Sequence, residues 1–288
     1  METWRAEYPF VSQHLDVGGG VRMHYLDEGP REGEAVVMLH GNPTWSFHFR
    51  RVVLALRGRM RCIVPDHVGM GLSGKPGDYP YRLNQRIADV AKLVDHLGLK
   101  RVHLVVHDWG GAVGFGFATR QPDRIGRIVA MNTAAFPDRN IPRSIALCRV
   151  PLLGALLVRG GNAFVRAALV RTVTKPLSAP VRAGYLAPYD SWAHRVAVHG
   201  FVLDIPMRAS HPTFATLQQI ETHLPWLRAK PLLIGWGERD FCFTPHFLAR
   251  WKTIFPEARF EVFPEAGHYL LEDAGDEFVP QIGEFLTK

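Results

Sequence analysis

The chain has 288 residues, of which 47% are hydrophobic and 21% are charged. That length supports one large core or two modest domains, and that composition excludes a disordered, collagen-like or coiled-coil protein. Lysine and arginine outnumber aspartate and glutamate by 34 to 27, with a mild concentration of basic residues between Arg139 and Arg208. Because no nucleic-acid-binding motif accompanies them, we interpret them as a solvated basic face and expect no nucleic-acid partner. Attraction of an anionic partner or a lipid-like substrate to this middle segment is the alternative.

The N-terminus lacks a basic patch followed by an apolar run, and the longest nearly apolar stretch, residues 150–158, contains Pro and Gly. We therefore expect neither a signal for export nor a membrane-spanning helix, which needs about 20 apolar residues. The three cysteines, Cys62, Cys148 and Cys242, form no CxxC pair. This spacing argues against a zinc site or a disulfide framework. It favours core or free thiols in a reducing compartment, so we expect a cytoplasmic protein.

Short apolar runs rich in β-formers alternate with helical patterns, which is typical of a largely parallel α/β sheet. Residues 83–97 predict the clearest helix, because their apolar residues recur on one face. A last helix from about Glu272 is expected to bury Phe278, Ile282 and Phe285. The predicted strands are residues 21–27, 35–40, 61–65, 102–107, 127–132, 231–236 and 259–263.

The strand pattern stops between Phe136 and about His211, where helical sequence is punctuated by Pro and Gly. A compact domain rarely holds so long a connection unless it has a structure and function of its own, such as a lid. We therefore predict an α/β core made of residues 1–135 and 212–288, split by an inserted helical cap at residues 136–211.

The segment VVHDWGG, residues 105–111, places Asp108 directly after a hydrophobic strand and before a glycine-bearing helix. This is the setting of a nucleophile elbow, in which a sharp turn exposes one side chain above the sheet. An aspartate that only caps the helix would also fit there. Three further segments favour the elbow, because each follows a predicted strand and carries a suitable partner.

LHGNPTWS, residues 39–46, stands where an oxyanion-hole loop belongs, so the backbone and side-chain N–H groups of Asn42 and Trp109 are candidate donors. LLIGWGERDFCF, residues 232–243, places Asp240 after the next-to-last strand. FPEAGHYLLED, residues 263–273, places His268 between the last strand and the last helix. The order Asp108, Asp240, His268 is the nucleophile, acid and base order of the α/β-hydrolase fold, a mostly parallel sheet flanked by helices. We predict that fold.

An aspartate nucleophile changes the expected reaction. A desolvated carboxylate attacks an alkyl carbon that carries a good leaving group, which would form an ester on Asp108. Water activated by His268, with Asp240 orienting the imidazole, would then cleave that ester. N–H groups of Asn42 and Trp109 would stabilise the departing anion without a competing positive charge.

These segments, together with PDHVGMGLSGKP (residues 65–76), resemble the haloalkane dehalogenases over nearly the whole chain. The resemblance implies that Asp108 is the nucleophile, His268 the base and Asp240 the acid, with Asn42 and Trp109 as donors to the leaving anion. One large subgroup of that family has a glutamate as its acid, after the strand that follows the nucleophile helix. The matching stretch here, MNTAAFP (residues 131–137), holds an asparagine and no acid. The Asp-His-Asp triad with an Asn-Trp pair therefore resembles the third subgroup.

Other strings resemble the β-lactone decarboxylases of bacterial long-chain olefin biosynthesis, which convert a dialkyl β-lactone into an alkene and carbon dioxide. They are MNTAAFP, LCRVPLLGALLVRGGNAF (147–164), GYLAPYDSW (184–192), FVLDIP (201–206) and WGERDFCF (236–243). The resemblance implies attack by Asp108 on the strained ring, at the carbonyl or at the ring carbon, and association with other enzymes of the olefin pathway. Residues 150–158 with Phe164, Val165, Leu169 and Val170 would either line an access path for alkyl chains or pack the cap onto the core.

β-Lactone decarboxylation is the leading hypothesis, and haloalkane dehalogenation is the alternative that the same site allows. An epoxide hydrolase would use Tyr185 and Tyr189 as donors, but that family usually has an aromatic residue where Asn42 stands. A receptor without activity is disfavoured, because every catalytic position is filled. The sequence has no P-loop, GxGxxG or metal-ligand cluster, so we expect no cofactor and no metal. We assign structural roles to a further set of polar residues, His40, His48, Asp66 and Asp204.

Overall fold

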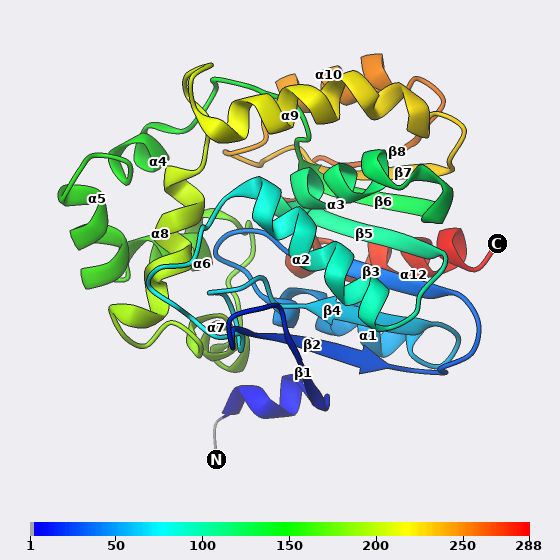
Figure 1. Cartoon of the computed structure of the whole chain (residues 1–288), viewed down its shortest axis with the longest axis horizontal. Coiled ribbons are helices and arrows are strands. Elements are labelled where there is room, and N and C mark those ends of the chain that lie inside the picture. The colour runs from blue at the N-terminus through cyan, green and yellow to red at the C-terminus, as the bar shows by residue number, and fades with distance from the viewer. Residues whose placement is uncertain (1–2) are drawn as a thin grey trace.

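The computed structural model describes residues 3–288, in which one eight-stranded sheet has helices on both faces (Figure 1). The strand order is β1-β2-β4-β3-β5-β6-β7-β8. The β1–β2 and β2–β4 pairs are antiparallel, and all the other pairs are parallel. The strands are β1 (Ser12–Asp16), β2 (Arg22–Glu28), β3 (Ala35–Leu39), β4 (Arg61–Pro65), β5 (Val102–Asp108), β6 (Ile125–Thr133), β7 (Leu232–Gly237) and β8 (Arg259–Phe263).

Two apolar clusters, one on each face of the sheet, form the core. On one face, strand side chains pack against α2 (Leu83–His96), α3 (Trp109–Arg120), α9 (Pro212–His223) and α10 (Pro245–Ile254). On the other face they pack against α1 (Arg50–Leu56), α11 (Leu270–Asp273) and α12 (Gly275–Leu286). The central strands β3, β4 and β5 are fully buried, as expected for parallel strands covered on both sides.

The predicted α/β-hydrolase architecture is confirmed, and all seven predicted strands are present with ends shifted by at most two residues. The edge strand β1 was missed, because only Leu15 of its five residues is buried and the alternation is weak. The predicted last helix is confirmed as α12, which begins at Gly275, three residues later than expected, and buries Phe278, Ile282 and Phe285. Glu272 itself lies in the short helix α11, which a break at Ala274 separates from α12.

No strand lies between β6 and β7 in the described chain. The inserted segment, residues 136–211, carries α4 (Arg143–Leu147), α5 (Leu153–Ala155), the π-helical turn η4 (Leu156–Gly160), α6 (Ala163–Arg171), α7 (Ala179–Leu186) and α8 (Val196–Leu203). Figure 1 shows these helices grouped at one end of the sheet, while α9 returns along the face that carries α2 and α3. Within residues 3–288 no single helix meets the length and apolarity of a membrane span; the pair 153–160 and 163–171, bent by 70°, meets them only jointly.

Candidate active site

Asp108 stands at the turn between β5 and α3, in a backbone conformation that L-residues rarely adopt, with φ 53°. Such a conformation costs about 1–3 kcal/mol and persists only where the surroundings enforce it. Here α3 packs very closely on the neighbouring strands. A Cβ at Gly110 would lie 1.9 Å from the carbonyl oxygen of Leu39, and a Cβ at Gly111 would lie 1.8 Å from Oγ1 of Thr133. Two glycines after the aspartate therefore make the predicted elbow possible.

The two carboxylate oxygens of Asp108 have different surroundings. Oδ1 accepts a hydrogen bond from the backbone N–H of Asn42 at 2.6 Å, whereas Oδ2 lies 3.8 Å from Nε2 of His268. Burial raises the pKa of Asp108 above 3.8; His268 and the backbone N–H groups of Asn42 and Trp109 oppose that rise. One oxygen is thus fixed by the protein, and the other is left to face the imidazole.

His268 is held by the second carboxylate of the site. Its Nδ1 donates to Oδ2 of Asp240 at 2.7 Å, so Nε2 is the ring nitrogen turned toward Asp108. Burial lowers the pKa of His268, but Asp240 and Asp108 outweigh burial and raise it above 6.5. The structure therefore brings together Asp108, His268 and Asp240, the three residues that the sequence predicts from distant segments.

Asn132 is a site residue that sequence reasoning missed. Its Nδ2 donates to Oδ2 of Asp240 at 3.0 Å and to the carbonyl of Gly237 at 3.0 Å, while its Oδ1 accepts from the Gly237 N–H at 2.9 Å. The N–H of Cys242 donates to the other oxygen of Asp240 at 2.6 Å. Asn132 is the penultimate residue of β6, in the stretch where the resemblance places the acid of another subgroup. That position could have indicated the role of Asn132, because β6 pairs with β7, the strand that precedes the loop of Asp240.

The predicted donor pair is placed differently from the sequence-based expectation. The backbone N–H of Asn42 binds the nucleophile itself, and its Nδ2 donates to the carbonyl of Val198 at 3.1 Å, which leaves one amide hydrogen unused. Within residues 3–288, the indole N–H of Trp109 has no hydrogen-bond partner. Both side chains line the cavity above Asp108. The backbone N–H groups of Asn42 and Trp109 therefore bind Asp108, while within residues 3–288 the Trp109 indole N–H and one amide hydrogen of Asn42 have no partner.

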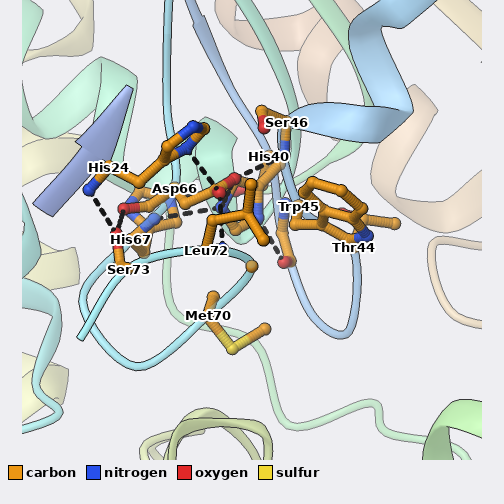
Figure 2. Close-up of polar contacts among 12 residues, drawn as sticks. His24, His40, Thr44, Trp45, Ser46, Asp66, His67, Met70, Leu72 and Ser73 are labelled. Carbon is orange, nitrogen blue, oxygen red and sulfur yellow. Dashed lines mark hydrogen bonds and ion pairs between the residues drawn. The ribbon is translucent and has the colours of Figure 1, made fainter. Parts of the chain in front are cut away.

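A buried polar network supports the loop that carries Asn42 (Figure 2). Asp66 accepts hydrogen bonds from the backbone N–H groups of Ser46 at 2.6 Å and Leu72 at 2.8 Å, and it pairs with His24 at 2.8 Å. Burial raises the pKa of Asp66, but His24, His40 and the backbone N–H of Leu72 bring it down to about 2. His40 bonds the carbonyl of Gly41 at 2.8 Å. Asp66 and His40 thus have the structural role expected of them.

A cavity of about 350 Å³ opens above the triad. Its polar lining residues include Asp108 and His268, while most of its wall is apolar and comes from α4, η4, α6 and the loops after β6 and β7. Cys148 and Cys242 line it as well, and neither is disulfide-bonded. An apolar cavity with a few convergent polar groups is the usual form of a small-molecule site.

Residues 150–158 and the apolar residues named with them are expected either to line an access path or to pack the cap onto the core, and each role holds for some of them. Leu157 and Phe164 line the cavity. Three other predicted residues, Val158, Val165 and Leu169, are buried in the core cluster. The remaining large apolar residues of the stretch, together with Val170, are exposed on the outer surface, namely Val150, Leu152, Leu153 and Leu156.

Residues 34–275 match the family model described as alpha/beta hydrolase fold. The chain belongs to the α/β-hydrolase family. It is 45% identical to the cis-3-alkyl-4-alkyloxetan-2-one decarboxylase of Shewanella oneidensis, across 97% of this chain and 89% of that protein. Identity to haloalkane dehalogenase 2 of Mycobacterium bovis is 35%, across 96% and 95% of the two chains. The structure of the haloalkane dehalogenase DbeA of Bradyrhizobium elkani aligns with a TM-score of 0.87 at 27% identity, covering 96% of this chain and 98% of that one.

The contacts of two tyrosines narrow the choice of activity within the α/β-hydrolase family. The tyrosines that an epoxide hydrolase would need do not line the cavity: Tyr185 donates to Glu272 at 2.5 Å, and Tyr189 donates to the carbonyl of Thr44 at 3.3 Å. The epoxide hydrolase alternative thereby loses its donors. In residues 3–288 no three His, Cys, Asp or Glu side chains are grouped to hold a metal ion.

Proposed function

We propose that this α/β-hydrolase is a β-lactone decarboxylase, which converts a cis-3-alkyl-4-alkyloxetan-2-one into an alkene and carbon dioxide. The observation that carries the proposal is a buried aspartate with one free oxygen at an apolar cavity, Asp108, in a chain more similar to a decarboxylase of that name than to the dehalogenases. An apolar wall suits a substrate whose only polar part is the lactone ring.

The first step is attack by Oδ2 of Asp108 on the ring carbon that bears the ring oxygen. The carbon–oxygen bond of the ring breaks, and its electron pair goes to the departing carboxylate oxygen. The second amide hydrogen of Asn42 and the indole N–H of Trp109 would stabilise that charge, since both side chains line the cavity. Meanwhile Oδ1, held by the Asn42 backbone N–H, becomes the carbonyl oxygen of the new ester.

In the second step the bond between the freed carboxylate and the former ring carbon that carries it breaks, and carbon dioxide leaves. The electron pair of the broken carbon–carbon bond forms the double bond of the alkene. The ester bond between Asp108 and the neighbouring carbon breaks at the same time, which restores the carboxylate of Asp108. This sequence consumes no water and no proton. Attack at the lactone carbonyl would instead leave an anhydride and an alkoxide, from which carbon dioxide has no direct exit. We therefore propose attack at the ring carbon.

His268 and Asp240 support the nucleophile in this scheme. An imidazolium 3.8 Å from Oδ2 favours the ionised form of Asp108 by about 4 kcal/mol at an effective dielectric constant near 20. The raised pKa of His268 fits that cationic form. In a haloalkane dehalogenase the same residue would have to be neutral, because it would take a proton from the water that cleaves the alkyl ester.

The organisation of the chain completes the proposal. Residues 136–211 act as the cap over a core made of residues 1–135 and 212–288, since the inserted helices supply much of the cavity wall. We also propose association with other enzymes of the olefin pathway. The three cysteines, none in a disulfide, support the proposed cytoplasmic location.

Incubation with a cis-dialkyl β-lactone and, separately, with 1-bromobutane tests the function. We expect alkene and carbon dioxide from the lactone, measured by gas chromatography with mass spectrometry, and little bromide from the haloalkane. Ready bromide release without alkene would replace decarboxylation by dehalogenation. Asp108→Asn, which removes the nucleophile, is the control for either activity.

A further inference from the structure

Large apolar side chains are exposed on one short stretch of the inserted segment. We call this group the apolar tip; its members are 41–83% exposed and comprise Leu147, Val150, Leu152, Leu153 and Leu156. Residues 3–288 have eleven exposed large hydrophobic side chains, so nearly half of them gather within ten positions. Single exposed apolar residues are ordinary on a soluble protein, whereas a group of them marks an interaction surface.

The backbone presents the tip outward. Leu152 has φ 62° and ψ −55°, and the N–H of Leu153 donates to the carbonyl of Pro151 at 2.7 Å, which together describe a strained γ-turn. The turn exposes 83% of the Leu152 side chain. In Figure 1 the adjoining helices α4 and α5 lie at the end of the molecule farthest from the strands. The tip is therefore accessible to a large, extended surface.

The segment of the chain that carries the tip is strongly basic. From Arg139 to Arg208 the chain has ten Lys and Arg residues but only two acidic residues, a net charge of +8 against +7 for the whole chain. Neither acid neutralises the group: Asp204 is buried and paired with arginines of the core, and Asp190 pairs with His194. The whole inserted segment, residues 136–211, also contains Asp138, which pairs with His246 and Arg250; its net charge is then +7, equal to that of the whole chain.

The tip also adjoins the cavity. Leu147 is 47% exposed and at the same time lines the cavity, and Leu157, which directly follows the last tip residue, lines it too. A molecule in contact with the tip is therefore next to the opening that leads to Asp108. The tip combines exposed apolar side chains with a basic segment of the chain, and it lies beside the cavity. This combination suits contact with a lipid surface better than contact with a polar protein partner.

We propose that the apolar tip docks on an anionic phospholipid surface, with its leucines among the acyl chains and the basic residues of segment 139–208 facing the headgroups. Anionic lipids attract such basic groups, and apolar insertion adds to the attraction. Apolar substrate and product would then exchange with the lipid beside Leu147. That exchange rests on the proposed function; the docking does not.

Flotation of the purified full-length protein with vesicles tests the docking in the absence of substrate. We expect the protein to float with vesicles that contain phosphatidylglycerol, to float poorly with pure phosphatidylcholine, and to dissociate as salt is raised. Leu152→Ser with Leu156→Ser should weaken the binding by roughly tenfold or more. The matched control is Leu54→Ser with Trp226→Ser, two exposed apolar residues elsewhere, and it should bind like the wild type.

Absence of wild-type flotation with anionic vesicles, or equal binding by the tip and control variants, would overturn the proposal. So would a tip-dependent change in oligomeric state without vesicle binding, because a second copy of the chain would then cover the tip. Decarboxylation of a short-chain, water-soluble β-lactone should be unchanged in the Leu152→Ser, Leu156→Ser variant, since neither residue lines the cavity. If the wild type forms no alkene from the lactone, the proposed function is refuted but the vesicle result still stands. The two proposals can therefore be refuted independently.

Discussion

Gly41→Ala should disable the active site through a single methyl group. A Cβ at Gly41 would lie 1.9 Å from Oδ1 and 2.4 Å from Cγ of Asp108, where real contacts stay beyond about 3.4 Å. The loop or the nucleophile must therefore move by roughly 1.5 Å, which breaks the 2.6 Å hydrogen bond from the Asn42 N–H to Oδ1. A lost hydrogen bond to a charged group is worth about 1.5–3 kcal/mol, and a displacement of this size alone lowers rates about 100-fold.

The assay is the initial rate of alkene formation from a cis-dialkyl β-lactone, with Tm measured alongside. We expect kcat to fall at least about 100-fold, while overpacking destabilises the fold by about 1–3 kcal/mol, which most folded domains survive. Gly58→Ala is the matched control, because a Cβ at exposed Gly58 meets no atom within 4 Å. A Gly41→Ala variant that keeps the wild-type rate would refute the close approach of the loop to the nucleophile.

Three further outcomes are expected. Asp240→Asn should lower the rate of alkene formation by roughly two to four orders of magnitude. In one orientation the new amide points its NH₂ at the Cys242 N–H, and in the other it points it at the N–H groups of Asn132 and His268, so a donor always faces a donor. A near-normal rate would place the acid elsewhere. Although 1-bromobutane is expected to react slowly, His268→Phe incubated with it for a long time should accumulate a butyl ester on Asp108 in intact-mass spectra, since no base remains to clear the ester. An unmodified mass after bromide release would contradict the covalent step. Burial raises the pKa of Asp108 above 3.8, so decarboxylation should decline as pH falls through that raised pKa and the nucleophile takes up a proton. The slow bromoalkane hydrolysis needs neutral His268, whose pKa lies above 6.5, so on acidification it should decline at a higher pH than decarboxylation; the reverse order of the two pH profiles would contradict these roles.

The sequence predicts the triad because each member directly follows a recognisable strand. Asp108 ends β5, Asp240 follows β7 and His268 follows β8, and parallel strands bring their carboxyl ends to one edge of the sheet. Strand β1 escaped prediction because one buried leucine leaves almost no pattern. Asn132 escaped because its role depends on hydrogen bonds to a strand about a hundred residues away.

The inserted segment shows a different limit of sequence reasoning. Its apolar residues are broken by Pro and Gly, so no single helical period assigns a side chain to the cavity, the core or the surface. Leu156, Leu157 and Val158 are consecutive, and they are respectively exposed, at the cavity and buried. Only the packing of the folded helices separates these three positions.

The central claim is that the carboxylate of one aspartate opens the lactone ring. The most direct measurement compares alkene formation from a cis-dialkyl β-lactone by the wild type and by Asp108→Asn, which nearly preserves the shape of the side chain. The account predicts a loss of at least about 10³-fold, with Tm nearly unchanged. Alkene formation by Asp108→Asn within tenfold of the wild-type rate would contradict it.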